Sequence, residues 1–154
     1  MMTEMTQQTE AKVIIFELMD MEYAIEVDAV QGIERAISIT RVPKTPSYVK
    51  GVINLRGVVT PVVDLRERFG LEPQEINDST RIIIVSLADY EVGLIVDGAN
   101  DVLDLPIEAI EPQPEVVGAV ESDFIAGVAK VENRLFIMLE LSKVLEPIKR
   151  AEVL

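Results

Sequence analysis

The feature that most constrains the fold of this chain is a repeated series of strand-like segments. Ile82–Leu87 resembles Ile14–Leu18, because both are runs of large apolar residues. Glu91–Asp97 resembles Glu22–Asp28, because a glutamate, a small residue, a valine and an aspartate fall in matching places. In the earlier copy apolar residues largely alternate with acidic ones, which is the period of a half-buried strand. Each half of the chain is therefore predicted to begin with two strands.

A third pair of segments follows in the same order. Gly127–Leu141 resembles Gly51–Leu65: both are fifteen residues long, open on Gly-Val, turn in the middle and close on an acidic residue and a leucine. In the earlier copy two apolar strands flank Arg56-Gly57, where glycine supplies the positive φ of a tight hairpin. Asp64 is placed to cap the helix that follows. A short helix is predicted after each copy, over Leu65–Phe69 and over Ser142–Leu145.

Three elements that match in one order predict an internal duplication. Aromatic residues make up 5% of the chain and Trp is absent, so the core must consist of Val, Ile and Leu, which favours strands. Each copy has about five short strands, the size of a small SH3-like barrel. We therefore predict an all-β fold with minor α content: two packed five-stranded SH3-like β-barrels, with short helices and a short C-terminal helix. A groove is expected near the pseudo-twofold axis, where equivalent positions of the two copies meet.

The chain is predicted to form one domain with two tails. Residues 1–11 are polar and slightly acidic, which is typical of a short disordered tail, and residues 148–154 form a C-terminal tail. The domain spans residues 12–147 and consists of two interleaved barrel lobes, centred roughly on residues 20–70 and 81–140. The second copy carries an added acidic, proline-bearing loop over Pro106–Asp123.

Two local expectations concern the first half. Asp28 is placed to cap a short helical turn that carries Val30 and Ile33 on one side, and these two residues belong either to the core or to a surface. Pro61 removes a backbone donor, so its strand is predicted to lie at an edge or to carry a bulge.

Arg56 is an unusual residue for its position. Asn, Asp or Gly more often precedes the glycine of a tight hairpin. An arginine there is either a tolerated surface charge or a donor aimed at a carboxylate or the backbone of a partner. The residues alone leave both interpretations open.

Charge and composition exclude several classes of function. The net charge is −13, from 27 acidic and 14 basic residues, which argues against binding to nucleic acid or to anionic membrane surfaces. No apolar run reaches the ~20 residues of a membrane span, so no direct membrane insertion is expected. Cys and His are absent, which excludes thiol nucleophiles, thiolate metal sites and imidazole acid–base chemistry and fits a reducing cytosol.

The sequence contains little that predicts catalysis. It has neither a glycine-rich phosphate loop nor a dinucleotide-binding fingerprint, so we expect no cofactor. Asp97, Asp101 and Asp104 could be metal ligands or an acid–base pair, but a solvated strand face and loop is favoured. Nothing couples these acids to a nucleophile or an oxyanion donor. We predict a protein that is not an enzyme, with an acidic-site hydrolase on a β-barrel as the remote alternative.

The segment Gly51–Leu65 resembles the signature of the CheW-like family of bacterial chemotaxis coupling proteins. The resemblance runs from about Val13 to Leu145 and includes Glu22–Val27, Val42-Pro43, Asn77–Thr80 and Glu91–Asp97. It implies two five-stranded β-barrels packed together, which agrees with the duplication.

The resemblance also implies a function in a two-component signalling system. CheW-like proteins are adaptors that dock, without catalysis, to the cytoplasmic tips of methyl-accepting chemoreceptors and to the regulatory domain of the histidine kinase CheA. They are cytoplasmic and recruited to membrane-associated receptor arrays. The related CheV scaffold carries the same module fused to a receiver domain. This sequence ends at Leu154 without a receiver, so a lone coupling protein is expected.

The family's receptor groove lies between the barrels, and the resemblance implies which residues of this chain line it. Val30 and Ala99 are equivalent under the repeat, as are Ile33 and Val102, as expected for a groove on a pseudo-twofold axis. Gly32 departs from the acidic or polar residue common at its place. The implied receptor-binding residues are Ile14, Val27, Val30, Ile33, Arg56, Ala99 and Val102. The implied kinase-binding residues are Glu111, Glu115 and Val116, the last smaller than the aromatic residue sometimes found there.

Overall fold

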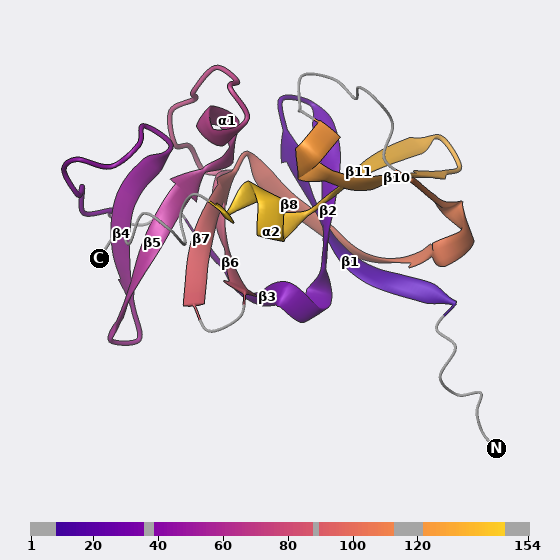
Figure 1. Cartoon of the computed structure of the whole chain (residues 1–154), viewed down its shortest axis with the longest axis horizontal. Helices are drawn as coiled ribbons and strands as arrows, with labels where there is room; N and C mark the ends of the chain where they lie inside the picture. The colour runs from indigo at the N-terminus through magenta and orange to yellow at the C-terminus, as the bar shows by residue number, and fades with distance from the viewer. Residues whose placement is uncertain (1–8, 36–38, 88–89, 113–121, 147–154) are drawn as a thin grey trace.

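The computed structural model describes residues 9–35, 39–87, 90–112 and 122–146, most of which form short strands (Figure 1). The strands are β1 (Glu10–Leu18), β2 (Met21–Glu26), β3 (Val30–Arg35), β4 (Val49–Leu55), β5 (Val58–Asp64), β6 (Arg81–Leu87), β7 (Tyr90–Val96), β8 (Gly98–Pro106), β9 (Ile110–Pro112), β10 (Ile125–Val131) and β11 (Arg134–Leu139). The helices α1 (Leu65–Arg68) and α2 (Leu141–Val144) are short, as are the 3₁₀ turns η2 (Val27–Ala29), η3 (Ile107–Ala109) and η4 (Ser122–Phe124). The prediction of a mainly β fold with short helices is confirmed.

The strands form two sheets that lie side by side (Figure 1). The six-stranded lobe has the order β8-β1-β2-β11-β10-β9, and the five-stranded lobe has the order β3-β6-β7-β5-β4. Each lobe therefore combines strands from both halves of the chain, and the lobes are not centred on residues 20–70 and 81–140. The reason is an exchange: β3 leaves the first hairpin to pair with β6, and β8 leaves the second hairpin to pair with β1.

The register of the strands confirms the duplication. Ile14 pairs with Ile25 in the first hairpin as Ile83 pairs with Leu94 in the second. The hairpins β4–β5 and β10–β11 have the same pairing at every position, with the irregularity at the same step, before Gly51 and before Gly127. Each of these hairpins also places its second strand parallel to a strand of the other half, β5 beside β7 and β11 beside β2.

Close backbone approach explains why both repeated segments open on glycine. A Cβ on Gly51 would lie 2.0 Å from the carbonyl oxygen of Thr40, and a Cβ on Gly127 would lie 2.6 Å from that of Glu111. Gly51 also has φ of +144°, a conformation that L side chains rarely adopt. In each lobe another segment pairs with the hairpin beside this glycine. In the five-stranded lobe it makes a single bridge, from Thr40 to Val52, and in the six-stranded lobe it is strand β9, which pairs with β10.

Several local expectations require correction. Val30 and Ile33 lie in strand β3, and the helical turn before them is confined to η2. Part of the loop predicted over Pro106–Asp123 forms η3 and β9, so one lobe has a sixth strand. The N-terminal tail predicted over residues 1–11 overlaps β1, which begins at Glu10, and residues 1–8 lie outside the described residues. The C-terminal tail at 148–154 lies outside the described residues.

Pro61 lies in an interior strand that has no bulge at this residue, so the prediction of an edge or a bulge at Pro61 is wrong. Strand β5 pairs with β4 on one side and with β7 on the other. The N–H and C=O of Val52, the partner of Pro61, turn outward to Thr40, so this pair exchanges no hydrogen bond with β5. On the other side the β7 ladder begins only at Val62. The missing donor of proline is therefore placed where no ladder bond needs it.

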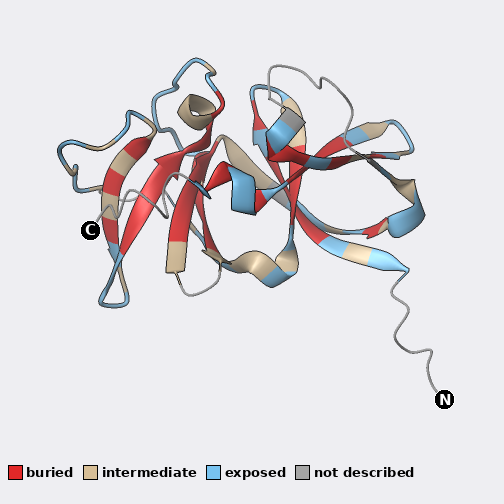
Figure 2. Ribbon diagram, in the orientation of Figure 1, coloured by how far each residue is buried: buried red, intermediate tan, exposed pale blue. Residues whose placement is uncertain are grey.

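Three apolar clusters form the core, one inside each lobe and one to which both lobes contribute. The central strands are buried over most of their length (Figure 2). In β1, Val13 and Ile15 pack inside the six-stranded lobe, while Ile14 and Phe16 belong to the largest cluster. In β6, Ile82 and Ile84 pack inside the five-stranded lobe, and the residues between them belong to the same largest cluster. We call this cluster, to which both lobes contribute, the shared core. A strand that is buried on both faces reads as an unbroken apolar run, which explains the runs in the sequence.

The two short helices pack against the shared core and contact each other. Asp64 is the N-cap of α1, and its carboxylate accepts a hydrogen bond of 2.9 Å from the Arg66 amide. The guanidinium of Arg68 donates to the carbonyl of Val144 at the end of α2, at 2.8 Å, and lies over the ring of Phe124, 4.5 Å from its centre. Among the described residues, no helix is long and apolar enough to cross a membrane.

Candidate functional site

Strand β3 directs two of the predicted receptor-binding residues toward the shared core. Val30 is opposite Val85 and Ile33 is opposite Ile83 in the antiparallel pair β3–β6. Residues that are directly opposite in such a pair point to the same face. Val85 and Ile83 belong to the shared core, so Val30 and Ile33 lie on the face that the five-stranded lobe turns toward the other lobe.

Strand β8 repeats this arrangement in the six-stranded lobe. Ala99 is opposite Phe16 and Val102 is opposite Ile14 in the pair β1–β8. Phe16 and Ile14 also belong to the shared core. The two exchanged strands therefore present equivalent residues over one core, as the repeat predicts.

These residues differ in how much of them reaches the surface. Ile33 is 42% exposed and Val102 is 59% exposed, which is unusual for large apolar side chains beside a core. Ile14 is only 7% exposed, so it supports this surface from below. The remaining members are half-buried, and Val27 and Val30 pack against the shared core. We call the set Val27, Val30, Ile33, Ala99 and Val102 the inter-lobe face.

Arg56 lies at the tip of the β4–β5 hairpin. Arg56 and Gly57 both have positive φ, +53° and +82°, as in the tightest hairpin turns, and the Asn54 side chain accepts a hydrogen bond of 2.9 Å from the Gly57 amide. The arginine is exposed, and within the described residues its guanidinium has no hydrogen bond or ion pair. The fold brings it to β3, because Arg56 and Gly32 line the same small hollow.

This hollow was not predicted from the sequence. It has a volume of about 40 Å³ and lies where β3, β6 and β7 meet the tip of the β4–β5 hairpin. Its two acids, Glu34 and Glu91, are half-buried and belong to different strands, and only the pairing of β3 with β6 and of β6 with β7 brings them together. We call it the β3 hollow; its lining residues are Gln31, Gly32, Glu34, Leu55, Arg56, Ile84 and Glu91.

Asp97 is held in a cluster of donors and is not a solvated surface acid. Its carboxylate accepts hydrogen bonds from Arg66, Nε at 2.8 Å and Nη2 at 2.5 Å, and from the Met19 amide at 2.9 Å. Burial opposes ionisation of this carboxyl, but the bonds from Arg66 and Met19 outweigh it and lower the pKa of Asp97. Asp97 stands between β7 and β8, at one of the two crossings between lobes, and its bonds tie that crossing to Arg66 of α1 and to Met19.

Asp101 is also paired, whereas Asp104 is exposed and has no hydrogen bond or ion pair with another described residue. Arg134 donates to Glu22 in a bidentate pair, with distances of 3.1 and 2.7 Å, and to Asp101 at 3.3 Å. Its guanidinium lies over the Phe136 ring, 4.8 Å from the centre. The hydrogen bonds to Glu22 raise the pKa of Arg134. Across residues 9–35, 39–87, 90–112 and 122–146, no three acidic side chains converge as metal ligands would.

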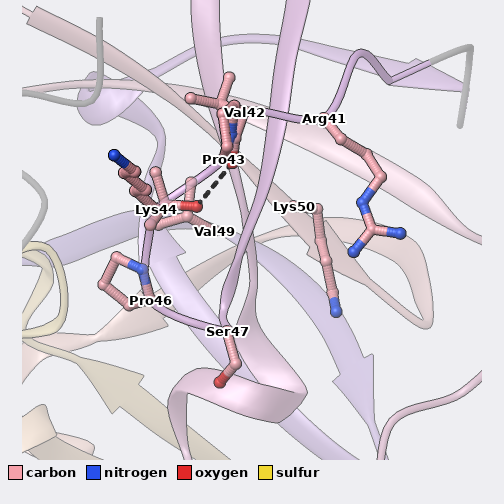
Figure 3. Close-up of a pocket in the computed structure, with 9 residues that line it drawn as sticks. Arg41, Val42, Pro43, Lys44, Pro46, Ser47, Val49 and Lys50 are labelled. Carbon is pink, nitrogen blue, oxygen red and sulfur yellow. Dashed lines mark hydrogen bonds between the residues drawn. The ribbon is translucent and has the colours of Figure 1, made fainter.

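A larger pocket of about 430 Å³ lies in the loop before β4 (Figure 3). Its lining includes three basic residues, but Arg41 and Lys50 point to one side while Lys44 points to the other (Figure 3). Lys50 is already paired with Glu67. The cations do not converge on one point, and the lining contains none of the predicted binding residues that the structure describes.

The residues predicted to contact a kinase are only partly described. Glu111 is exposed in strand β9, opposite Val128 of β10. Glu115 and Val116 lie outside the described residues. The assignment of this region to a kinase therefore stays a prediction.

Comparison with known proteins gives a consistent family. Residues 12–149 match the CheW-like domain family. The chain is 48% identical over 139 residues to a chemotaxis protein CheW of Bacillus subtilis, which covers 90% of this chain and 89% of that protein. It is 36% identical to a chemotaxis protein CheW of Klebsiella aerogenes, over 86% of this chain and 80% of that protein. The crystal structure of the scaffolding protein TtCheW from Thermoanaerobacter tengcongensis superposes with a TM-score of 0.84 at 34% identity, covering 89% of this chain and 93% of that one.

Proposed function

The chain belongs to the CheW-like domain family of chemotaxis scaffold proteins, and we propose that it couples methyl-accepting chemoreceptors to the histidine kinase CheA. In this proposal it works by docking alone, as a cytoplasmic adaptor recruited to receptor arrays at the membrane. The names of its relatives support a role in chemotaxis and the assembly of chemotaxis signalling proteins.

The observation that carries the proposal is the inter-lobe face. Ile33 and Val102 are exposed apolar side chains at equivalent positions, and each rests on a buried strand of the shared core. A chemoreceptor tip is helical, and an amphipathic helix docks on such a face through apolar residues spaced by three and four. The strands beneath, β1 and β6, are each hydrogen-bonded to a neighbouring strand on both sides, so little backbone entropy would be lost on binding.

Arg56 also supports the assignment of a receptor to this face. It is exposed, without a hydrogen-bond partner among the described residues, and held beside β3 by the hairpin turn. A guanidinium in that position is available to a carboxylate or carbonyl of the docked helix. The exposed Glu111 edge of the six-stranded lobe would face the kinase.

The test is to place a charge on the inter-lobe face and on a matched position elsewhere. Ile33→Asp should weaken binding of a receptor cytoplasmic fragment about a hundredfold, because about 1 kcal/mol of apolar burial is lost and an unpaired charge adds at least about 2 kcal/mol. Ile76 is an isoleucine of similar exposure, 52%, in the loop before β6. Ile76→Asp should leave binding unchanged.

Calorimetric titrations with the receptor fragment and with CheA, beside thermal melting, complete this experiment. We expect Ile33→Asp to stay folded and to keep its affinity for CheA, because its side chain is not fully buried. Arg56→Ala should weaken receptor binding about tenfold or more, by one charge-assisted hydrogen bond. Equal receptor affinity of the wild type and a folded Ile33→Asp protein would refute the receptor assignment of this face.

A further inference from the structure

The two lobes differ at one pair of equivalent positions, which is occupied by an arginine in the six-stranded lobe and by a valine in the five-stranded lobe. In the six-stranded lobe the guanidinium of Arg134 lies between the carboxylates of Glu22 and Asp101 and over the ring of Phe136. Phe136 belongs to the interior of that lobe. Arg134 therefore closes the end of this lobe with a cation held by two acids.

The same register identifies the equivalent positions in the five-stranded lobe. Glu91 is opposite Ser86 in β6–β7 as Glu22 is opposite Glu17 in β1–β2. Gly32 follows the irregularity in β3–β6 as Asp101 follows it in β1–β8.

The position equivalent to Arg134 is Val58, since each pairs with the last residue of the preceding strand, Leu55 or Val131. Glu22 thus has a counterpart in Glu91, while the arginine is replaced by a valine that is 55% exposed.

A second carboxylate is nevertheless present in the five-stranded lobe. The Glu34 carboxylate lies 3.7 Å from where a Cβ on Gly32 would be, and thus close to the place that the Asp101 side chain has in the other lobe. Glu34 and Glu91 both line the β3 hollow. In the described part of the chain neither carboxylate has a hydrogen bond or ion pair, and the nearby Arg56 does not bind either of them.

We propose that the β3 hollow binds the guanidinium of an arginine side chain supplied by a protein partner. The bound arginine takes the place that Arg134 takes in the other lobe, between Glu91 and Glu34. With two acids and one base in its lining, the hollow still attracts one further positive charge. Two flanking carboxylates suit the planar, multi-donor fork of arginine better than a compact ammonium.

The partner is the receptor helix docked on the inter-lobe face, and this identification rests on the proposed function. Gly32 of the hollow and Ile33 of the inter-lobe face are consecutive in β3 and point to opposite sides of it. A helix that covers Ile33 therefore brings a long basic side chain within reach of the hollow around the edge of this strand. Such a contact adds specificity for a basic residue to a surface that is otherwise apolar.

The guanidinium site is tested first without any receptor. The wild type is titrated with N-acetyl-arginine amide while backbone amide signals are followed by NMR, with the neutral N-acetyl-citrulline amide as the control probe. We expect saturable shifts at Gly32, Glu34 and Glu91 with the arginine probe alone, weakened at least about tenfold by Glu91→Gln. Shifts that are spread over the acidic surface, or that do not change in Glu91→Gln, would overturn the proposal.

The second test fills the hollow from within the chain. Val58→Arg restores the arginine of the other lobe, so it should abolish the probe shifts and weaken receptor binding about tenfold or more, with a melting temperature equal to or above that of the wild type. Val59→Arg adds the same charge at the next exposed position, on the other side of the strand, and should change neither. Full receptor affinity in Val58→Arg would overturn the contact with the receptor. If the wild type binds the probe but no receptor fragment, the site stands and the proposed function fails.

Discussion

Replacement of Asp97 by asparagine tests whether the Arg66–Asp97 cluster fixes the crossing between the lobes. The substitution keeps the size of the side chain and leaves an oxygen that can accept from the Met19 amide. It removes the charge that the Arg66 guanidinium binds through two atoms. The experiment therefore isolates the ion pair from the rest of the cluster.

The magnitude follows from how far the pair is shielded. The Arg66 and Asp97 side chains are 14% and 21% exposed. Breaking a buried pair costs about 3–5 kcal/mol, whereas an exposed pair contributes about 0–1 kcal/mol. For a pair that is largely but not fully covered, we expect Asp97→Asn to lower the free energy of unfolding by about 2 kcal/mol at pH 7.

The pH dependence gives a second signature. The folded-state pKa of Asp97 is lowered below its value in the unfolded chain, about 3.9. The stability that this shift supplies is present above pH of about 4 and is lost as the pH falls through the folded-state pKa. The difference between wild type and Asp97→Asn should therefore be constant near neutrality and shrink toward pH 3.

Urea unfolding at a series of pH values measures this difference. Asp104→Asn is the matched control, because it removes the same charge from an exposed residue of β8 that has no hydrogen bond or ion pair within the described part of the chain. We expect that control to stay within about 0.5 kcal/mol of the wild type. A difference for Asp97→Asn that is below about 0.5 kcal/mol, or that is the same at pH 3 and pH 7, would show that the pair does not fix the crossing.

Two further predictions concern the β framework. Gly51→Ala should lower the free energy of unfolding by about 3 kcal/mol or more in urea titrations, because its Cβ would meet the Thr40 backbone. Gly57→Ala has open space around it and should lower that free energy by only about 1–2 kcal/mol, the cost of a left-handed alanine. Equal effects would refute the steric argument. Arg134→Met should cost less than about 1.5 kcal/mol by thermal melting, since its side chain is 41% exposed, and a larger loss would mean that this lobe depends on the arginine for closure.

Part of the candidate site could be predicted from the sequence, and part could not. The repeat and the family resemblance indicated Val30 with Ala99 and Ile33 with Val102, and the strand register gives each pair equivalent places. The helical interpretation of Val30 and Ile33 was wrong because a spacing of three in so short a segment fits a bulged strand equally well. The acids of the β3 hollow were missed because nothing in a single strand shows which acid of another strand lies beside it.

The sequence by itself determined the local elements of this protein. Its repeat established the duplication, and its apolar runs at Val13–Phe16 and Ile82–Val85 established strands whose residues the structure buries. These features can be read from the sequence because each depends on the order of residues within one short segment.

Only the tertiary structure decided which strands share a lobe. Strands β3 and β8 exchange between the halves, and β5 and β11 each lie parallel to a strand of the opposite half. Backbone hydrogen bonds are the same whichever strand supplies them, so the side-chain pattern of one strand does not name its partner. The choice is made by the packing of the shared core and by contacts between distant residues, such as that of Arg66 with Asp97, which exist only once the whole chain is folded.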